Sequence, residues 1–261
     1  MAETDGAAAA TAEGTQLGLR ASEQQRENRD TMKRLFEQTP LPTEDLLVNL
    51  PLYMRSSVVA KFLWVNELYE LIVDRPGAIM EFGVWWGSNL ALFESLRAVH
   101  EPYNYNRRIV GFDTFEGYPE ARPEDGDDPL VHTGAYAVPP GHPEHLEQML
   151  GCHERENPMG HIRKHELVVG DATQTIDPYL ERHPETMISL AYFDMQLYEP
   201  TKACLEAIRP YLVEGAVLAM DELACAEFPG ETVAFREVFG LDAQKMRRSR
   251  FLPDRTYVIV G

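Results

Sequence analysis

Carboxylates recur at the ends of short apolar segments that are typical of strands. The segments GAIMEFG, RRIVGFD, HELVVGD and TMISLAYFD each contain or end in an acid, and GAVLAMDE runs into two. In open α/β sheets, ligands bind at the carboxyl ends of the strands, where the strand order reverses. Crowded carboxylates repel one another, so this edge predicts a metal ion, a cationic ligand, or both. Any single acid could instead form a turn or cap a helix. The acids are Glu81, Asp113, Asp171, Asp194, Asp221 and Glu222.

The turn after the first segment predicts a ligand that contains a nucleoside but no phosphate. In MEFGVWWGSNLALF, the residues Glu81, Gly83 and Gly87 lack the middle glycine of the dinucleotide fingerprint G-x-G-x-x-G. Two adjacent tryptophans fill the turn, so a pyrophosphate has little room, whereas an uncharged or cationic group could be enclosed. S-adenosylmethionine carries a sulfonium and no phosphate. Simple packing is the alternative role for the tryptophans.

Two further acids extend this predicted cofactor site. Asp113, at the end of the second strand, is placed to accept the ribose hydroxyls, and Asp171, after the third, could accept from the adenine amino group. The neighbouring residues Ser88, Asn89, Thr114 and Ala172 complete the predicted S-adenosylmethionine site.

Strand and helix patterns alternate along most of the chain and predict an α/β fold. A helix is expected at 56–73, another from Ser88, and two closing strands at the C-terminus. The expected architecture is a mostly parallel, doubly wound, Rossmann-like sheet. Residues 1–20 are expected to be disordered, 21–75 to form a helical segment packed on the core, and 76–261 to form the main domain. Its irregular stretch 115–145 is predicted to be a lid.

Composition excludes several partners. The formal net charge is −18, which argues against nucleic acid and anionic membranes, because both require basic surfaces. The 3 cysteines show no metal-binding or disulfide spacing. The sequence shows neither a signal-peptide pattern nor a long apolar run, so a cytoplasmic protein is expected.

The segments LYELIVDRPGAIMEFGVWWGSNLA, IVGFDTFEGYPE and FDMQLYEPTKACLEAIRPYLVEGAVLAMDEL resemble the TylF/MycF-type sugar O-methyltransferases of antibiotic biosynthesis, which include macrocin O-methyltransferase. Within this family the pattern is most similar to the calicheamicin-pathway branch. The resemblance implies a class I, seven-stranded methyltransferase that uses S-adenosylmethionine and a divalent cation, usually Mg²⁺, and often forms homo-oligomers. It also implies an acceptor that is a deoxysugar, for example a nucleotide-activated sugar such as TDP-rhamnose.

The family's metal acids fall on Asp194, Asp221 and Glu222. One position departs from the pattern, because relatives carry Asp-x-Asp where this chain has Asp194-Met195-Gln196. Gln196 is neutral, which leaves open the contribution of a second acid to metal or sugar binding.

Methyl transfer to a hydroxyl also requires a base and an acceptor site. Asp194 is the first choice for the base, with His132, His142 and His145 as alternatives. The acceptor is expected near Tyr53, Met54, Arg122 and Gln196. Phosphates of a nucleotide sugar would need cations, and the candidates besides Arg122 are Arg247, Arg248 and Arg250.

The same fold allows three other functions, and the missing middle glycine argues against the oxidoreductase among them. They are a catechol-type O-methyltransferase, a nicotinamide oxidoreductase and an inactive binding protein.

Overall fold

The computed structural model describes residues 21–241 and 245–261. The chain forms two compact units, Met1–Val59 and Ala60–Gly261. The segment predicted at 21–75 is therefore divided between both units, and the helix α4 (Ser56–Glu70) crosses the boundary. The predicted tail at 1–20 lies outside the described residues.

Short helices make up the described part of the first unit. They are α2 (Glu23–Glu37), α3 (Thr43–Val48) and the 3-10 helix η1 (Leu50–Tyr53). Ser22 caps α2, because its hydroxyl accepts from the Gln25 backbone while the Gln25 side chain accepts from the Ser22 backbone. The Tyr53 hydroxyl donates to Thr39 Oγ1 at 2.7 Å, and the Tyr53 ring packs edge-on against Phe36.

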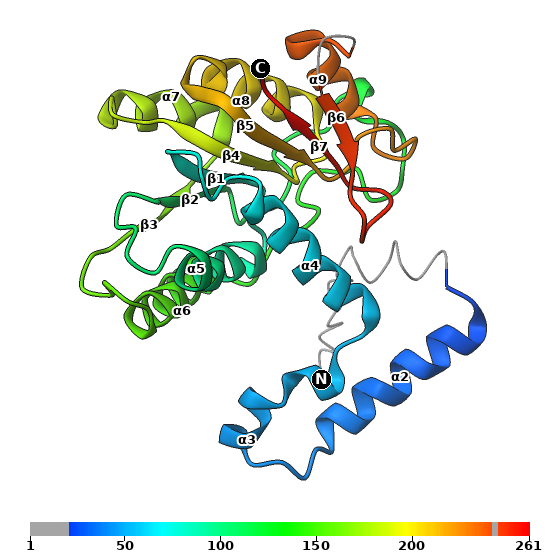
Figure 1. Ribbon diagram of the computed structural model, residues 1–261. Helices are drawn as coiled ribbons and strands as arrows, with labels where there is room; N and C mark the ends of the chain where they lie inside the picture. The colour runs from blue at the N-terminus through cyan, green and yellow to red at the C-terminus, as the bar shows by residue number, and fades with distance from the viewer. Residues whose placement is uncertain (1–20, 242–244) are drawn as a thin grey trace. The chain divides into compact units, whose positions relative to one another are not determined.

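A seven-stranded sheet forms the centre of the second unit, in the order β3-β2-β1-β4-β5-β7-β6 (Figure 1). The first five strands are parallel, and β7 runs antiparallel to both of its neighbours. This confirms the predicted mostly parallel sheet with an antiparallel final strand. Because β1 pairs with both β2 and β4, the strand order reverses at β1. The strands are β1 (Ala78–Phe82), β2 (Ile109–Asp113), β3 (His165–Val169), β4 (Ile188–Phe193), β5 (Leu212–Met220), β6 (Lys245–Arg248) and β7 (Thr256–Ile259).

Helices cover both faces of this sheet, as predicted. Helices α4, α5 and α6 contribute to one apolar core, and α7, α8 and α9 contribute to the other, on the opposite face (Figure 1). The helices of the second unit besides α4 are α5 (Ser88–His100), η2 (Pro123–Asp125), α6 (His142–Glu156), α7 (Ala172–Arg182), α8 (Tyr198–Ile208), η3 (Arg209–Tyr211) and α9 (Gly230–Phe239).

Burial on both faces explains the continuous apolar runs of the central strands. In β4, Leu190 and Tyr192 face the core under α4 and α5, whereas Ala191 and Phe193 face the core under α7 and α8. Phe82 of β1 stacks on Phe193, with 4.7 Å between the ring centroids. The central strand ends are therefore rigidly packed, which fixes where their acids emerge.

Two helices were not identified in the sequence. Helix α7 follows Asp171, and α6 begins at His142, inside the segment predicted as a lid at 115–145. The segment between β2 and α6 is otherwise irregular apart from η2. In the described part of the chain, every helix is too short or too polar to cross a bilayer.

Candidate active site

Three neighbouring strands end together and place their acids at one edge of the sheet. The backbone N–H of Asp194, after β4, donates to Phe82 O of β1 at 2.9 Å, and that of Asp221, after β5, donates to Phe193 O at 3.1 Å. Asp221 and Glu222 are buried, and Asp194 is partly buried. The ends of β4 and β5 therefore bring these acids to the same edge of the sheet. Among the described residues, however, Asp194, Asp221 and Glu222 do not form a group in which one ligand atom of each lies within 4.8 Å of the others.

A protein cation lies within this acid cluster, which we define as Asp194, Asp221 and Glu222. The Arg255 guanidinium, just before β7, lies 2.7 Å from Asp221 Oδ2. The Tyr192 hydroxyl donates to Asp221 Oδ1 at 2.5 Å. Part of the counter-charge that the sequence predicted is thus supplied by Arg255, which was not identified because it lies far away along the chain.

The remaining two acids keep raised pKa values. Burial, and then the charge of Asp221, raise the pKa of Asp194 well above its usual value, against the opposing effects of Lys61 and Arg255. Burial also raises the pKa of Glu222 to about 7, although Arg255 opposes this shift. Burial is the main cause of both shifts, so the charged forms of these two carboxyl groups are disfavoured in the folded protein.

Gln196 connects the cluster to the segment predicted as a lid. Its Nε2 donates to Glu222 Oε1 at 3.4 Å, and its Oε1 accepts from the Tyr118 hydroxyl. An aspartate at this position could not donate to Glu222. The departure from Asp-x-Asp thus replaces a repulsive contact with a hydrogen bond.

Buried polar atoms without a hydrogen-bond partner among the described residues flank the turn after β1, on Glu81 of β1 and Asn89 of α5. Asn89 Nδ2 donates to Glu81 Oε1 at 2.8 Å, but Glu81 Oε2 and Asn89 Oδ1 are buried with no hydrogen bond. Burial raises the pKa of Glu81 to about 8, despite the hydrogen bond from Asn89. Unsatisfied acceptors of this kind are compatible with a ligand that donates hydrogen bonds.

The two glycines of this turn have a packing role. A Cβ on Gly83, where φ is 89°, would lie 2.2 Å from the Asp194 carbonyl oxygen. One on Gly87, where φ is 82°, would lie 2.3 Å from the Leu146 side chain of α6. The sequence placed Gly83 in the predicted cofactor turn. In the structure it lets β1 approach the acid-bearing loop after β4.

Asp113 holds the same turn through its backbone. Its Oδ2 accepts from the N–H groups of Val84 and Trp85, both at 2.7 Å, and its Oδ1 accepts from Phe115 N at 2.6 Å. These bonds use three of about four acceptor positions of a carboxylate. Asp113 therefore orders the predicted cofactor turn, in which Trp85 adopts a left-handed φ of 51°.

The other predicted cofactor residues have local contacts. Asp171 caps α7, since its Oδ1 accepts from Thr173 N at 2.9 Å, and Ala172 packs in the core behind it. Thr114 Oγ1 donates to Gly117 O at 2.8 Å, and Ser88 begins α5. Capping was the alternative role considered for a single acid, and Asp171 has it.

The predicted acceptor residues are spread over both units. Tyr53 and Met54 belong to the first unit. In the second unit, Arg122 is exposed and pairs with Glu199 at 2.9 Å. Arg250 pairs with Glu67 at 2.8 Å, whereas Arg247 and Arg248 lie on the edge strand β6.

The three alternative bases lie on or beside the irregular segment. His132 and His145 are exposed, and the His142 ring packs edge-on against Trp86 with 4.9 Å between centroids. Trp86 remains 39% exposed, so the tryptophan pair is only partly used in packing.

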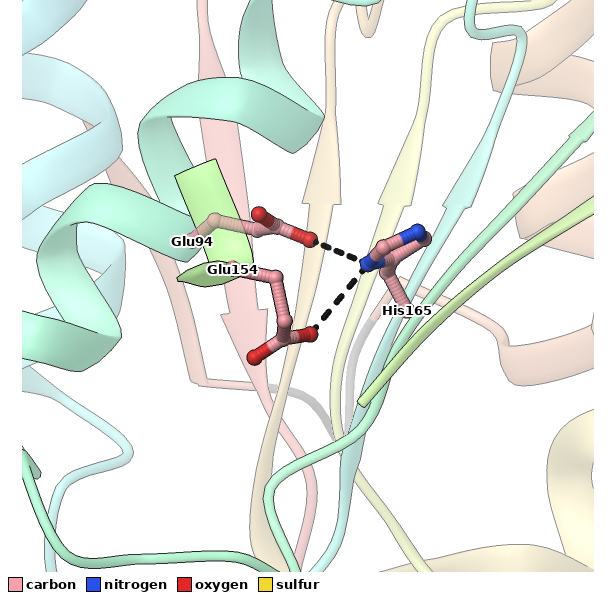
Figure 2. A group of neighbouring side chains, drawn as sticks. All are labelled: Glu94, Glu154 and His165. Atoms are coloured by element: carbon pink, nitrogen blue, oxygen red, sulfur yellow. Dashed lines mark hydrogen bonds and ion pairs between the residues drawn. The ribbon is translucent and has the colours of Figure 1, made fainter. Parts of the chain in front are cut away.

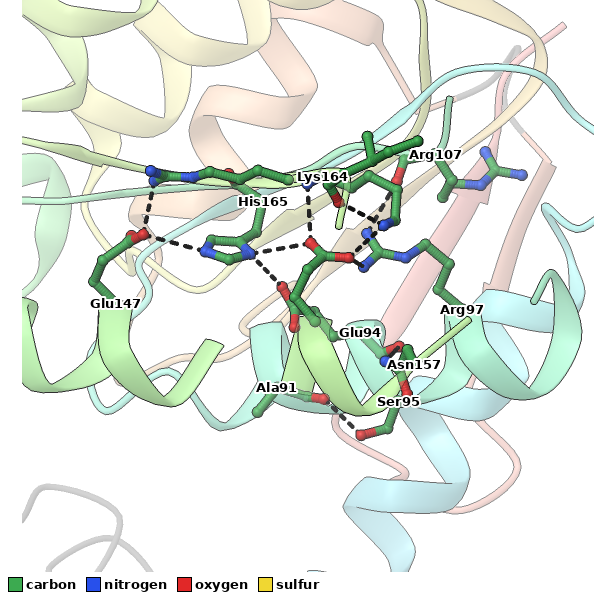
Figure 3. A network of polar contacts seen from close by, with 12 residues as sticks. Ala91, Glu94, Ser95, Arg97, Arg107, Glu147, Asn157, Lys164 and His165 are labelled. Carbon is green, nitrogen blue, oxygen red and sulfur yellow. Dashed lines mark hydrogen bonds and ion pairs between the residues drawn. The ribbon is translucent and has the colours of Figure 1, made fainter. Parts of the chain in front are cut away.

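A second charged group lies away from the strand ends. Among the described residues, the group whose possible ligand atoms all lie within 4.8 Å of one another is Glu94, Glu154 and His165 (Figure 2). Protein cations neutralise it, because Glu154 Oε1 lies 2.6 Å from Arg97 and 2.5 Å from Lys164. Figure 3 shows Arg97 and Lys164 in the same polar network as Glu94 and His165.

Burial alone would lower the pKa of His165, but hydrogen bonds to Glu154 and Glu94 outweigh burial and raise it to about 9. We therefore interpret this group as a buried ion network with a protonated imidazole.

Comparison with known proteins identifies the family. No protein-family model matches the chain, and no curated protein does. A crystal structure of a calicheamicin methyltransferase is 45% identical, with a TM-score of 0.90, over 92% of this chain and 94% of that one. The apo structure of a TDP-rhamnose 3'-O-methyltransferase of calicheamicin biosynthesis is 42% identical, with a TM-score of 0.82, over 92% and 96%.

A more distant structure shows the fold alone. The O-methyltransferase NovP is 18% identical, with a TM-score of 0.58, over 78% of this chain and 80% of that one.

The predicted similarity to the calicheamicin branch is confirmed by the two structures above. The fold and the 45% and 42% sequence identity to these two structures, over 92% of this chain, lead to the same assignment. The chain belongs to the TylF/MycF-type S-adenosylmethionine-dependent sugar O-methyltransferases.

Proposed function

We propose that this enzyme methylates a hydroxyl of a nucleotide-activated deoxysugar, such as TDP-rhamnose, in antibiotic biosynthesis. The observation that carries the proposal is the acid cluster at the ends of β4 and β5, in a chain 42% identical to a TDP-rhamnose 3'-O-methyltransferase. A sugar hydroxyl is a poor nucleophile and must lose its proton during or before attack. A cluster of carboxylates provides groups that accept this proton.

Asp194 is the proposed general base. Burial, and then the charge of the neighbouring Asp221, raise its pKa above the usual value, so its carboxylate is a stronger base than that of an exposed aspartate. It directly follows β4, whose end is packed between β1 and β5, so its position is fixed by the core of the sheet. The proposed base thus combines basicity with rigidity.

Asp194, Asp221 and Glu222 are also the proposed ligands of a divalent cation. Their donor atoms are all oxygens, as Mg²⁺, Mn²⁺ and Ca²⁺ prefer. Arg255 and Tyr192 already contact Asp221, whereas the raised pKa values of Asp194 and Glu222 reflect negative charge that a cation would stabilise. When bound, such an ion would lower the pKa of the acceptor hydroxyl.

The turn after β1 and the end of β2 form the proposed cofactor site. Glu81 and Asn89 hold unsatisfied acceptor oxygens there, and Asp113 orders the backbone of the turn. The amino and hydroxyl groups of S-adenosylmethionine are suitable donors to such acceptors.

A labelled-methyl transfer assay tests this proposal. The purified enzyme is offered TDP-rhamnose, free rhamnosides and catechols, each with and without excess chelator. We expect transfer to the nucleotide sugar, loss of transfer with chelator, and recovery with Mg²⁺. Preferential methylation of catechols would contradict the acceptor, and full activity in chelator would contradict the metal site.

A further inference from the structure

Glu231 ties together the two loops that carry the acid cluster. It lies in the first turn of α9, and its side chain is buried. Its Oε1 accepts from the backbone N–H groups of Met195 at 3.2 Å and Gln196 at 3.1 Å. Its Oε2 accepts from the N–H of Glu222 at 3.0 Å. One carboxylate is therefore bonded to the loop after β4 and to the loop after β5.

The start of α9 is packed directly against the first of these loops. A Cβ on Gly230 would lie 2.6 Å from both Gln196 O and Tyr198 N. There is thus no space for a side chain between the helix and the loop. This close contact between Gly230 and the loop places the neighbouring Glu231 carboxylate within hydrogen-bonding distance of the Met195 and Gln196 N–H groups.

The loop that Glu231 holds is strained at Gln196. The φ of this residue is 62°, in the left-handed region that side-chain-bearing residues rarely adopt. Such a conformation persists only where the surroundings hold it. In this conformation the Gln196 amide accepts from Tyr118 and donates to Glu222. The strained conformation therefore lets the Gln196 side chain link the segment after β2 to the acid cluster.

We propose that Glu231 is a positioning residue for methyl transfer, which holds Gln196 in its strained conformation and ties the loop of Gln196 to the loop of Glu222. The inference rests on the proposed function of the acid cluster at the acceptor hydroxyl. A carboxylate is required because two acceptor oxygens must face three N–H donors, and an amide offers only one oxygen.

The variant Glu231→Gln tests this proposal with little change in volume. The NH₂ group of the glutamine would face a backbone N–H on one of the two loops. Because both groups are donors, that hydrogen bond would be lost. We expect kcat to fall about 10- to 100-fold, because small displacements of reacting groups have effects of this size. The affinity for S-adenosylhomocysteine should stay within about twofold, because the hydrogen bonds that order the cofactor turn come from Asp113 and not from Glu231.

Amide hydrogen exchange gives a readout that is independent of turnover. In Glu231→Gln we expect faster exchange in peptides that contain Met195, Gln196 and Glu222, with unchanged exchange in β1 and β2. Glu237→Gln is the matched control, since Glu237 lies on the same helix and its exposed carboxylate pairs with Lys202 at 2.7 Å. The control should change neither kcat nor exchange in the two loops.

Unchanged kcat or unchanged exchange in Glu231→Gln would overturn the proposal. Equal losses of kcat and cofactor affinity would also overturn it, because they indicate a general structural role. If this variant does not fold, Glu231→Asp is the second test, because its side chain keeps both oxygens but is one methylene shorter. It should also lower kcat while it leaves the affinity for S-adenosylhomocysteine unchanged. A wild-type enzyme that leaves TDP-rhamnose unmethylated counts against the proposed substrate alone, since the exchange experiment needs no acceptor.

Discussion

The guanidinium of Arg255 lies 2.7 Å from Asp221 Oδ2, inside the cluster of acids at the ends of β4 and β5. Arg255 Nη1 also donates to the Asp221 carbonyl oxygen at 2.9 Å, so the arginine binds both the side chain and the backbone of one residue. A fixed positive charge is thus part of the site. It limits how much negative charge is left for a bound cation or for the acceptor.

Removal of this charge should destabilise the enzyme. We expect Arg255→Gln to lower the free energy of unfolding by about 3 kcal/mol, because a buried carboxylate loses its partner. Mg²⁺ should restore part of this loss if the acids bind it. Urea unfolding with and without Mg²⁺ measures both effects. Arg247→Gln, on the edge strand β6, is the control, and equal stability of the two variants would contradict the prediction.

The two acids with raised pKa values should differ in their effect on turnover. Asp194→Asn removes the proposed base and should reduce kcat by about 100-fold or more. Glu222→Gln should reduce it less, because it removes charge but no proton acceptor. Both variants should bind S-adenosylhomocysteine like the wild type, as measured by calorimetry. Full activity of Asp194→Asn would show that another group accepts the proton.

Asp113 should control cofactor binding. In Asp113→Asn one of the two acceptor oxygens is replaced by a donor, so N–H groups of the turn after β1 lose their partner. We expect S-adenosylmethionine to bind more weakly by about 1–3 kcal/mol. Glu116→Gln, a nearby exposed substitution, should leave the affinity unchanged. Equal calorimetric affinities for the two variants would place the cofactor elsewhere.

The predicted lid has a buried anchor. Asp125 in η2 accepts from Tyr198 N at 2.5 Å and from Arg122 N at 2.6 Å. Asp125→Ala should therefore increase the rate of limited proteolysis within 115–141, and cofactor with acceptor should protect this segment in the wild type. Glu124→Ala, which changes an exposed neighbour, is the control. Cleavage rates that match in both variants would show that the anchor is unimportant.

The buried ion network of His165 should make stability dependent on pH. Its pKa is raised to about 9 in the folded state, so protonation stabilises the fold fully below the unfolded pKa of about 6.5. This contribution, about 3 kcal/mol, is lost as the pH rises through about 9. Glu94, Glu147 and Glu154 face the imidazole.

Urea midpoints from pH 6 to pH 10 measure this effect. They should fall with rising pH in the wild type, and His165→Gln should remove the fall over this range. His161→Gln changes an exposed histidine and should retain it. A similar slope in His165→Gln would assign the pH dependence to other groups.

Most strands and the acids that follow them were predicted from the sequence because both depend on local patterns. The apolar runs that lead to Asp113 and Asp194 form β2 and β4, and α5 begins at Ser88, directly after the glycine-bounded turn, as predicted. Asp171 shows the limit of this reasoning. An acid after a strand looks the same in the sequence whether it binds a ligand or caps the next helix. In the structure Asp171 accepts a hydrogen bond from Thr173 N and therefore caps α7.

Arg255, Glu231 and Tyr118 could not be assigned to the site in this way. Arg255 contacts Asp221 of the acid cluster, which lies 34 positions away in the chain. Glu231 and Tyr118 both contact Gln196, which lies 35 and 78 positions away from them. Such contacts follow from the pairing of β7 with β5, from the packing of α9 and from the path of the irregular segment after β2. The sequence by itself determined the fold class, the edge of the sheet that carries the acids and the family. Only the tertiary structure decided which charges compensate those acids, because hydrophobic periodicity and turn chemistry act over a few residues, whereas charge compensation depends on which buried groups the folded chain brings together.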